Sequence, residues 1–283
     1  MQKLTGSEIP SVLREIPQPP KELWLDGELP NFDDYIYLAV VGSRKFTNYG
    51  RECCEKLIMG LAGKPVCIVS GLAIGIDTLA HKTALCAGLP TVAVLPSGVD
   101  RKSLYPRQNV KLADEIVKSG GALLSENTPG FKAALYSFPQ RNRIMAGLSK
   151  AVLIIEAGDR SGTLVTARMA LDYNRTVLVV PGSIFNQSSI GANRLLKQGA
   201  SPVCSSEDIL IELGLESESG QALLDLSSLS ELEKKVYEIL IEPLPRDDLL
   251  RELNLEISEA NSLLTMMEIK GLIKESLGEM RIS

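Results

Sequence analysis

Short apolar runs that alternate with helical patterns from residue 35 onward are the strongest constraint on the fold of this chain. Each run is almost continuously apolar, as in the strands of a parallel sheet that is covered on both faces. Strands that alternate with helices predict an α/β fold with a mostly parallel sheet. The predicted strands are Ile36–Val41, Val66–Ser70, Thr91–Leu95, Ala122–Leu124, Ala151–Ile155 and Val177–Val180. The predicted helices span about 48–62, 75–87, 107–118, 140–149 and 161–173.

The rest of the sequence divides into smaller parts around an extended Rossmann-like domain, which we predict over residues 35–212. Residues 1–34 are rich in proline and are expected to form an irregular arm, with Trp24 and Leu25 against that domain. Residues 213–229 have the composition of a polar linker. Three helical patterns and a hairpin pattern predict a small winged-helix domain over residues 230–283. These patterns span about 230–241, 246–253, 258–270, Leu272–Glu275 and Met280–Ile282.

Composition argues against several classes of protein. A hydrophobic content of 45% in 283 residues is sufficient for a buried core. No run of about 18 apolar residues occurs and the N-terminal residues lack an apolar signal core, so we expect a cytoplasmic protein without a membrane span. The five cysteines show no Cys-x-x-Cys spacing and the chain has one histidine, His81. We therefore expect no metal or cofactor, and we expect the cysteines and His81 to be structural.

The net charge of −5 hides an uneven distribution along the chain. Residues 1–130 are neutral, residues 131–200 carry a net charge of +6, and residues 201–283 carry −11. A local basic patch governs phosphate binding, whereas total charge governs solubility and non-specific association. We therefore predict a cationic groove in the main domain and an acidic C-terminal part that does not itself bind DNA.

The segment Phe138–Thr166 carries the strongest functional signal. Arg141, Asn142 and Arg143 open a helical pattern, and the small-residue turn Gly158–Thr163 connects the next strand to another helix. Ligands of open α/β sheets bind at the carboxyl ends of strands, where helix N-termini favour phosphate. This arrangement predicts an anionic, phosphorylated ligand.

Phe138 suggests that the ligand is a single-stranded nucleic acid, because such ligands need cations for phosphates and rings for bases. Each stacked base contributes about 1–3 kcal/mol. Tyr136 would add a second ring and Lys132 a further charge. Other interpretations of these residues stay open: Phe138 packs in the core, one arginine caps a helix, or Asn142 is structural.

Two other turns, after the strands Ile36–Val41 and Val66–Ser70, join the Gly158–Thr163 turn in the predicted site, where they provide backbone N–H groups and a cation for the ligand. In the Gly158–Thr163 turn, the Ser161 hydroxyl is expected to cap the following helix as well as to contact phosphate or ribose. Asp77 has two open interpretations, a ligand contact or stabilisation of a helix dipole by about 0.3–1 kcal/mol. Arg44 either grips a phosphate or extends into solvent. The turns contribute Gly42, Ser43, Arg44, Gly71, Gly75, Ser161, Gly162 and Thr163 to the predicted site.

Over roughly residues 9–212, these motifs resemble those of the DprA/Smf family of DNA-processing proteins. The resemblance implies a protein that binds single-stranded DNA, protects incoming strands in natural transformation and helps load the RecA recombinase. It also implies a homodimer formed through the Rossmann-like domain. The shared motifs are Phe138-Pro139 before Arg141–Arg143, Ser161–Ala167, Val41–Arg44, Ser70–Asp77, Tyr105-Pro106 with Asn109, Val180–Gly182, Gly191–Asn193 and Gly199-Ala200.

The resemblance further implies which residues contact DNA. Some relatives carry a lysine three residues before the phenylalanine, where this chain has Leu135, and Lys132 is the alternative cation. The predicted recognition helix of the winged helix, residues 258–270, is mostly apolar with two glutamates and one lysine. We expect it to contact protein rather than duplex DNA. The positions that match the family's DNA pocket are Arg44, Phe138, Arg141, Asn142 and Arg143, with Ser161–Thr163 nearby.

An enzyme with a related fold is the alternative function. Phosphoribohydrolases of the lysine-decarboxylase-like type carry an arginine, a strand, and then a glycine-rich turn followed by a catalytic glutamate. In this chain the slot of that glutamate holds Thr166. Threonine cannot act as a carboxylate base or stabilise an oxocarbenium charge. The sequence therefore favours a non-catalytic binding protein.

Overall fold

The computed structural model describes residues 1–215, 230–240, 242–276 and 278–282. The chain forms two compact units that divide near residue 217, and each is described here by itself. No helix in these residues is long and apolar enough to span a membrane. The predicted linker over 213–229 lies almost wholly outside the described residues.

A nine-stranded sheet forms the centre of the first unit, in the order β1-β2-β6-β5-β4-β3-β7-β8-β9. Strands β3 to β9 run parallel to one another, whereas β1 and β2 are antiparallel additions at the β6 edge. The predicted α/β fold is therefore confirmed. The strands are β1 (Gln2–Thr5), β2 (Glu22–Gly27), β3 (Ile36–Val41), β4 (Val66–Ser70), β5 (Thr91–Val94), β6 (Ala122–Ser125), β7 (Ala151–Ile154), β8 (Thr176–Val179) and β9 (Ser201–Pro202).

The strand order places a topological switch point between β3 and β7. From β3 the chain moves outward through β4, β5 and β6, and it then returns to pair β7 with the other side of β3. Connections that leave adjacent strands in opposite directions open a crevice at their carboxyl ends, which is where such sheets bind ligands. The fold therefore fixes the position of a site before any side chain is considered.

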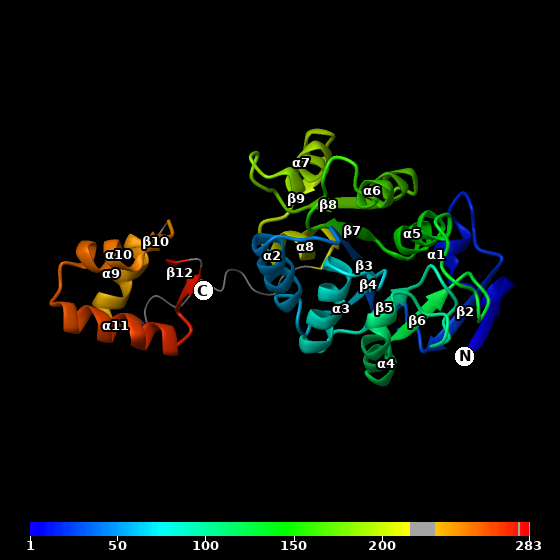
Figure 1. The fold of residues 1–283 in the computed structure, drawn as a ribbon, viewed down its shortest axis with the longest axis horizontal. Coiled ribbons are helices and arrows are strands. Elements are labelled where there is room, and N and C mark those ends of the chain that lie inside the picture. Colours follow the sequence, from blue (N-terminus) through cyan, green and yellow to red (C-terminus); the bar gives the residue numbers. More distant parts are fainter. Residues whose placement is uncertain (216–229, 241, 277, 283) are drawn as a thin grey trace. The chain divides into compact units, whose positions relative to one another are not determined.

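Helices cover both faces of the sheet, as the continuous apolar strands predict (Figure 1). Alternate strand residues point to opposite faces, so that Ala39 and Val41 pack with α5 and α6, whereas Leu38 and Val40 pack with α2 and α3. The helices are α1 (Ser11–Arg14), α2 (Asn48–Met59), α3 (Ile76–Cys86), α4 (Val110–Lys118), α5 (Ser137–Leu148), α6 (Thr163–Asp172), α7 (Ile190–Lys197) and α8 (Ser206–Glu212).

Helix α5 begins three residues earlier than its pattern predicts, at Ser137. Phe138 and Pro139 therefore belong to its first turn, where proline is tolerated because that backbone N–H has no helical partner. The Ser137 hydroxyl accepts a hydrogen bond from the Ala134 backbone N–H over 3.1 Å. This early start turns Phe138 from a loop residue into a residue held by a helix.

Residues 1–34 are not the irregular arm that their prolines suggest. Strand β2 pairs with both β1 and β6, and Leu23 and Leu25 are buried in the same core as β3. Gly27 has a φ of +96°, and a Cβ at this position would lie 2.3 Å from the carbonyl oxygen of Gly121. The N-terminal residues are thus an integral edge of the sheet.

The second unit has the element order of a winged helix, as predicted. Its three-stranded antiparallel sheet has the order β10-β12-β11. Helix α11 exposes Ser262, Thr265, Met266 and Ile269, while Lys270 pairs with Glu233 over 2.7 Å. Neither the cations nor the amides that read duplex DNA dominate this face. The elements are α9 (Glu231–Ile239), β10 (Leu244–Pro245), α10 (Arg246–Leu253), α11 (Ile257–Ile269), β11 (Ile273–Ser276) and β12 (Glu279–Ile282).

Replacement of Gly27 tests the integration of the N-terminal edge. Gly27→Ala combines an unfavourable φ with a backbone clash and should lower the free energy of unfolding by about 1–3 kcal/mol. Gly63→Ala is the matched control, because Gly63 has a φ of +74° and no neighbour within 4 Å of the added Cβ. Urea denaturation should show the larger loss for Gly27→Ala, and equal losses would contradict a close approach of β2 to Gly121.

Candidate nucleic-acid-binding site

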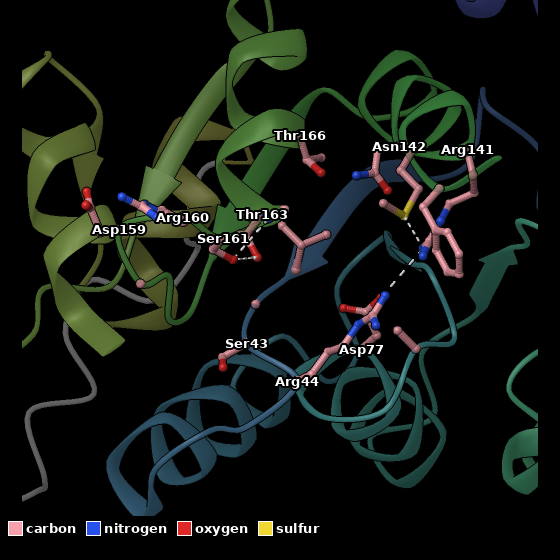
Figure 2. A pocket seen from close by; sticks show the side chains of 17 residues that line it. Ser43, Arg44, Asp77, Arg141, Asn142, Asp159, Arg160, Ser161, Thr163 and Thr166 are labelled. Atoms are coloured by element: carbon pink, nitrogen blue, oxygen red, sulfur yellow. Dashed lines mark hydrogen bonds and ion pairs between the residues drawn. The ribbon is translucent and has the colours of Figure 1, made fainter. Parts of the chain in front are cut away.

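A pocket of about 430 Å³ lies at the switch point, at the carboxyl ends of β3, β4 and β7 (Figure 2). Its wall combines the loop after β3, the loop after β4 with the start of α3, α5 from Phe138 to Met145, and the turn between β7 and α6. The pocket thus lies at the edge of the sheet where the sequence predicts the site. The pocket is lined by Val41, Gly42, Ser43, Arg44, Ala73, Asp77, Phe138, Arg141, Asn142, Met145, Gly158, Asp159, Arg160, Ser161, Gly162, Thr163 and Thr166.

Arg44 and Phe138 form the accessible part of the predicted constellation. The Arg44 guanidinium lies over the Phe138 ring, 5.4 Å from its centroid, and Tyr105 meets the same ring edge-on at 5.7 Å. Phe138 is partly exposed rather than buried in the core. Within residues 1–215 no carboxylate pairs with Arg44, so its charge is available to a ligand. A cation beside an open ring is the combination that unpaired nucleotides need.

Arg141 is part of the pocket floor, not a free cation. Its side chain is 5% exposed, its Nη1 lies 3.6 Å from the Asp77 carboxylate, and Nη1 also donates to the Met145 sulfur at 3.2 Å. Burial raises the pKa of Asp77, while Arg141 and the backbone N–H groups of Ala73 and Gly71 oppose this shift. Removing one partner of a buried ion pair typically costs about 3–5 kcal/mol. The pair is therefore structural and orients the floor.

Arg143 lies outside the pocket, which corrects the prediction that it joins Arg44 there. Its Nη2 donates to both carboxylate oxygens of Glu126 at 2.5 Å, and the arginine side chain is 9% exposed. Asn142, for which a binding role and a structural role were both open, is half-buried and lines the pocket. Successive helix residues point in different directions, so three adjacent polar residues cannot all face one ligand.

Two of the predicted binding glycines are required by packing. A Cβ on Gly71 would lie 1.0 Å from Arg141 Nη1, and a Cβ on Gly75, where φ is +95°, would lie 2.4 Å from the Ser43 carbonyl oxygen. That carbonyl accepts a hydrogen bond from the Ile76 N–H at 3.1 Å. The first backbone N–H of α3 therefore donates to a carbonyl oxygen of the loop after β3. Gly42 lines the pocket, and a Cβ at this position would lie 2.7 Å from the Ile76 side chain.

The turn between β7 and α6 retains the features of a phosphate cradle. Ser161 Oγ accepts a hydrogen bond from the Thr163 N–H at 3.2 Å and donates to Thr163 Oγ1 at 2.9 Å, so Ser161 does support the helix start. A Cβ on Gly162 would meet no atom within 4 Å, so packing within the chain does not require glycine there. An open backbone at a helix start suits an approaching anion.

Arg160 is a pocket residue that the sequence interpretation missed. Its side chain is exposed, and no ion pair involving it occurs among the described residues. Neighbouring Asp159 forms an ion pair with Arg194. Both Arg44 and Arg160 line the pocket, and Figure 2 shows them on separate loops, with the Arg160 side chain extending toward Asp159. Its position in the sequence could have indicated this role, since Arg160 lies within the small-residue turn Gly158–Thr163.

The described lining of this pocket holds no carboxylate that lacks an ionic partner. Thr166, in the slot of the hydrolase glutamate, is buried and lines the wall. The two carboxylates of the lining, Asp77 and Asp159, are each held in an ion pair. Glu156 is 2% exposed and accepts hydrogen bonds from the backbone N–H and hydroxyl of Thr47, so it fixes the loop after β3.

The remaining predicted residues lie apart from the pocket. Lys132 is exposed in the loop before α5, and Leu135 and Tyr136 project from the same loop with exposures of 91% and 60%. Buried His81 has its Nδ1 2.7 Å from Thr91 Oγ1, and burial lowers the pKa of His81 to about 3. No cluster suited to a metal ion occurs in the described parts of the chain.

The chain is similar in sequence to proteins of a known family. The model of the family described as DNA recombination-mediator protein A matches residues 3–214, and that of the DprA winged helix domain matches residues 221–278. Escherichia coli protein Smf is 45% identical over 194 residues, which are 69% of this chain and 51% of that protein. The match thus spans about half of that relative's length.

Two solved structures share the fold of the first unit. DNA processing protein A from Streptococcus pneumoniae is 39% identical with a TM-score of 0.69, and the match covers 75% of this chain and 74% of that one. The Helicobacter pylori protein, whose structure is described with a single-stranded DNA binding mode, is 31% identical with a TM-score of 0.67, covering 75% and 96%. Together with the family-model matches over nearly the whole sequence, these similarities show that the chain belongs to the DprA/Smf family of DNA-processing proteins.

Proposed function

We propose that this chain is a non-catalytic, cytoplasmic protein that binds single-stranded DNA and protects incoming strands in natural transformation. The observation that carries the proposal is the Arg44 guanidinium over the accessible Phe138 ring at the mouth of the pocket. The cation would bind a phosphate while the ring stacks on a base. Asn142, from the same helix as Phe138, and the turn Ser161–Thr163 would complete the contacts.

The relative from Helicobacter pylori supports this choice of ligand. Its structure is described with a single-stranded DNA binding mode, and it shares the fold of the first unit at 31% identity. We extend that ligand to this chain because the polar residues of the pocket suit phosphates and bases. Dimer formation through the first unit and assistance in loading RecA complete the proposal, and the family resemblance supports both.

A hydrolase that releases a base from a nucleotide is the second candidate, favoured by the glycine-rich turn at the pocket. Such chemistry needs a carboxylate to stabilise an oxocarbenium ion or activate water. Thr166 stands in the glutamate slot, and Asp77 and Asp159 are committed to arginines.

We expect no free base from nucleoside monophosphates incubated with the protein, since the pocket lining offers no unpaired carboxylate. Chromatography of the incubation is the measurement, with Thr166→Glu as the matched comparison for the restored carboxylate. Base release by the wild-type protein at a rate above the protein-free reaction would contradict a purely binding role.

Salt-titrated binding of single-stranded and duplex oligonucleotides tests the proposed function directly. We expect single strands to bind more tightly than duplex, because paired bases cannot stack on Phe138. Each phosphate that the protein neutralises should contribute about −0.7 to the slope of log affinity against log salt concentration. Equal affinity for single strands and duplex would count against the proposal.

Arg44 and Arg143 should respond differently to truncation. Arg44→Ala removes a free cation and should lower single-strand affinity roughly tenfold or more without loss of stability. Arg143→Ala leaves Glu126 unpaired and should lower the free energy of unfolding by about 1–3 kcal/mol, with a smaller effect on binding. Exposed Arg168 on α6 lies outside the pocket, and Arg168→Ala is the matched control. Unchanged affinity of a folded Arg44→Ala variant would remove the central contact of the proposal.

A further inference from the structure

The ligand-binding edge of the sheet continues beyond the pocket. Strands β4, β5 and β6 follow β3 in that spatial order, so the loops after β5 and β6 lie next along the same edge (Figure 1). Hydrogen bonds join these two loops: the Gly98 N–H donates to the Phe131 carbonyl at 3.0 Å, and the Gly130 N–H donates to Asp100 at 2.6 Å. The two loops therefore form one continuous surface beside the pocket.

Apolar and aromatic side chains are exposed on this surface. Tyr105 contacts the Phe138 ring and is 44% exposed, so the surface is continuous with the pocket lining. Tyr136 packs edge-on against Phe131 with 6.4 Å between ring centroids and is 60% exposed. Leu135 is 91% exposed. Apolar side chains that gather in solvent beside a pocket mark a surface that a ligand covers.

The charged side chains of the same loops leave an excess of cations. Lys102, Arg107 and Lys132 are exposed. Within the described residues no carboxylate pairs with any of them, and Arg107 donates to the carbonyl oxygens of Arg101 and Lys102.

The nearby carboxylates are committed to other groups. Asp100 accepts hydrogen bonds from Ser103 and Gly130, and Glu126 pairs with Arg143. Asp114 pairs with Arg101 over 2.6 Å. Exposed rings among unpaired cations, without free carboxylates, match the needs of an unpaired polynucleotide better than those of a protein partner.

We propose that Tyr105, Leu135 and Tyr136, with Lys102, Arg107 and Lys132, form a second binding surface, the β5–β6 platform, for the single strand that leaves the pocket. This inference rests on the proposed function and adds the path of the DNA, which runs along the edge of the sheet from the end of β3 toward the end of β6. Bases stack on the tyrosines and Leu135 while phosphates lie against the cations. Binding through ring faces and phosphates is tolerant of sequence and excludes duplex.

Oligonucleotide length separates the platform from the pocket. Fluorescence anisotropy would compare oligothymidylates of about six and about twenty nucleotides, because comparable sites cover about 4–16 nucleotides. Tyr136→Ala should weaken binding of the long oligonucleotide roughly tenfold and leave the short one nearly unchanged. The double variant Lys102→Gln/Arg107→Gln should lower the salt slope for the long oligonucleotide by about 1.4, since each lost phosphate contact contributes about 0.7.

Phe185→Ala is the matched control, because Phe185 is 92% exposed in the loop after β8, on the other side of the pocket. It should leave both affinities unchanged. If the DNA instead left the pocket toward β8, Phe185→Ala would weaken binding of the long oligonucleotide and Tyr136→Ala would not, which would overturn the platform. Equal wild-type affinity for the two lengths would also overturn it while leaving the pocket intact. Failure of both lengths to bind would refute the proposed function itself. Since all these side chains are exposed, circular dichroism should show folded variants.

Discussion

The buried ion pair between Arg141 and Asp77 is the contact on which the site depends. It joins the first turns of α5 to the start of α3 across the switch point, and Gly71 leaves the space that the guanidinium fills. An unpaired charge at that depth would be strongly unfavourable, so the two helices are held in one arrangement. That arrangement places Phe138 beneath Arg44 and points Asn142 into the pocket. Arg141 therefore acts as a positioning residue.

A division between structural and available arginines explains how a basic segment can fold compactly. Arg141, Arg143 and Arg194 are neutralised by carboxylates, whereas Arg44 and Arg160 are not, within the part of the chain that the structure describes. The +6 charge of residues 131–200 consequently overstates the charge that a ligand meets. The predicted cationic groove is reduced to a few free guanidiniums beside a ring, and its affinity depends on where these groups lie.

Sequence patterns predicted the parts of the fold that rest on local physics. Continuous apolar strands and helical periods identified the parallel sheet, and the order of the loops predicted the edge at which the pocket lies. The edge strand β2 was missed because its neighbouring prolines suggest irregular structure, yet its pairing with β6 is a long-range contact. The ion-pair partners of Arg141 and Arg143 could not be predicted for the same reason. Their partners, Asp77 and Glu126, are distant in sequence, and no one-dimensional pattern shows which carboxylate a guanidinium will meet.

The small number of free cations in the pocket limits how tightly the pocket alone can bind single-stranded DNA. A pocket of about 430 Å³ accommodates a short segment of polynucleotide, and two free arginines supply few phosphate contacts. Because the electrostatic part of affinity grows with the number of phosphates neutralised, tight binding requires contacts outside the pocket. Exposed rings and cations along the β5 and β6 loops supply such contacts within one chain, and a homodimer would supply them by joining two pockets on one strand. Stacking and phosphate contacts spread along an edge would make the proposed binding tolerant of sequence, since no single base would contribute most of the binding energy.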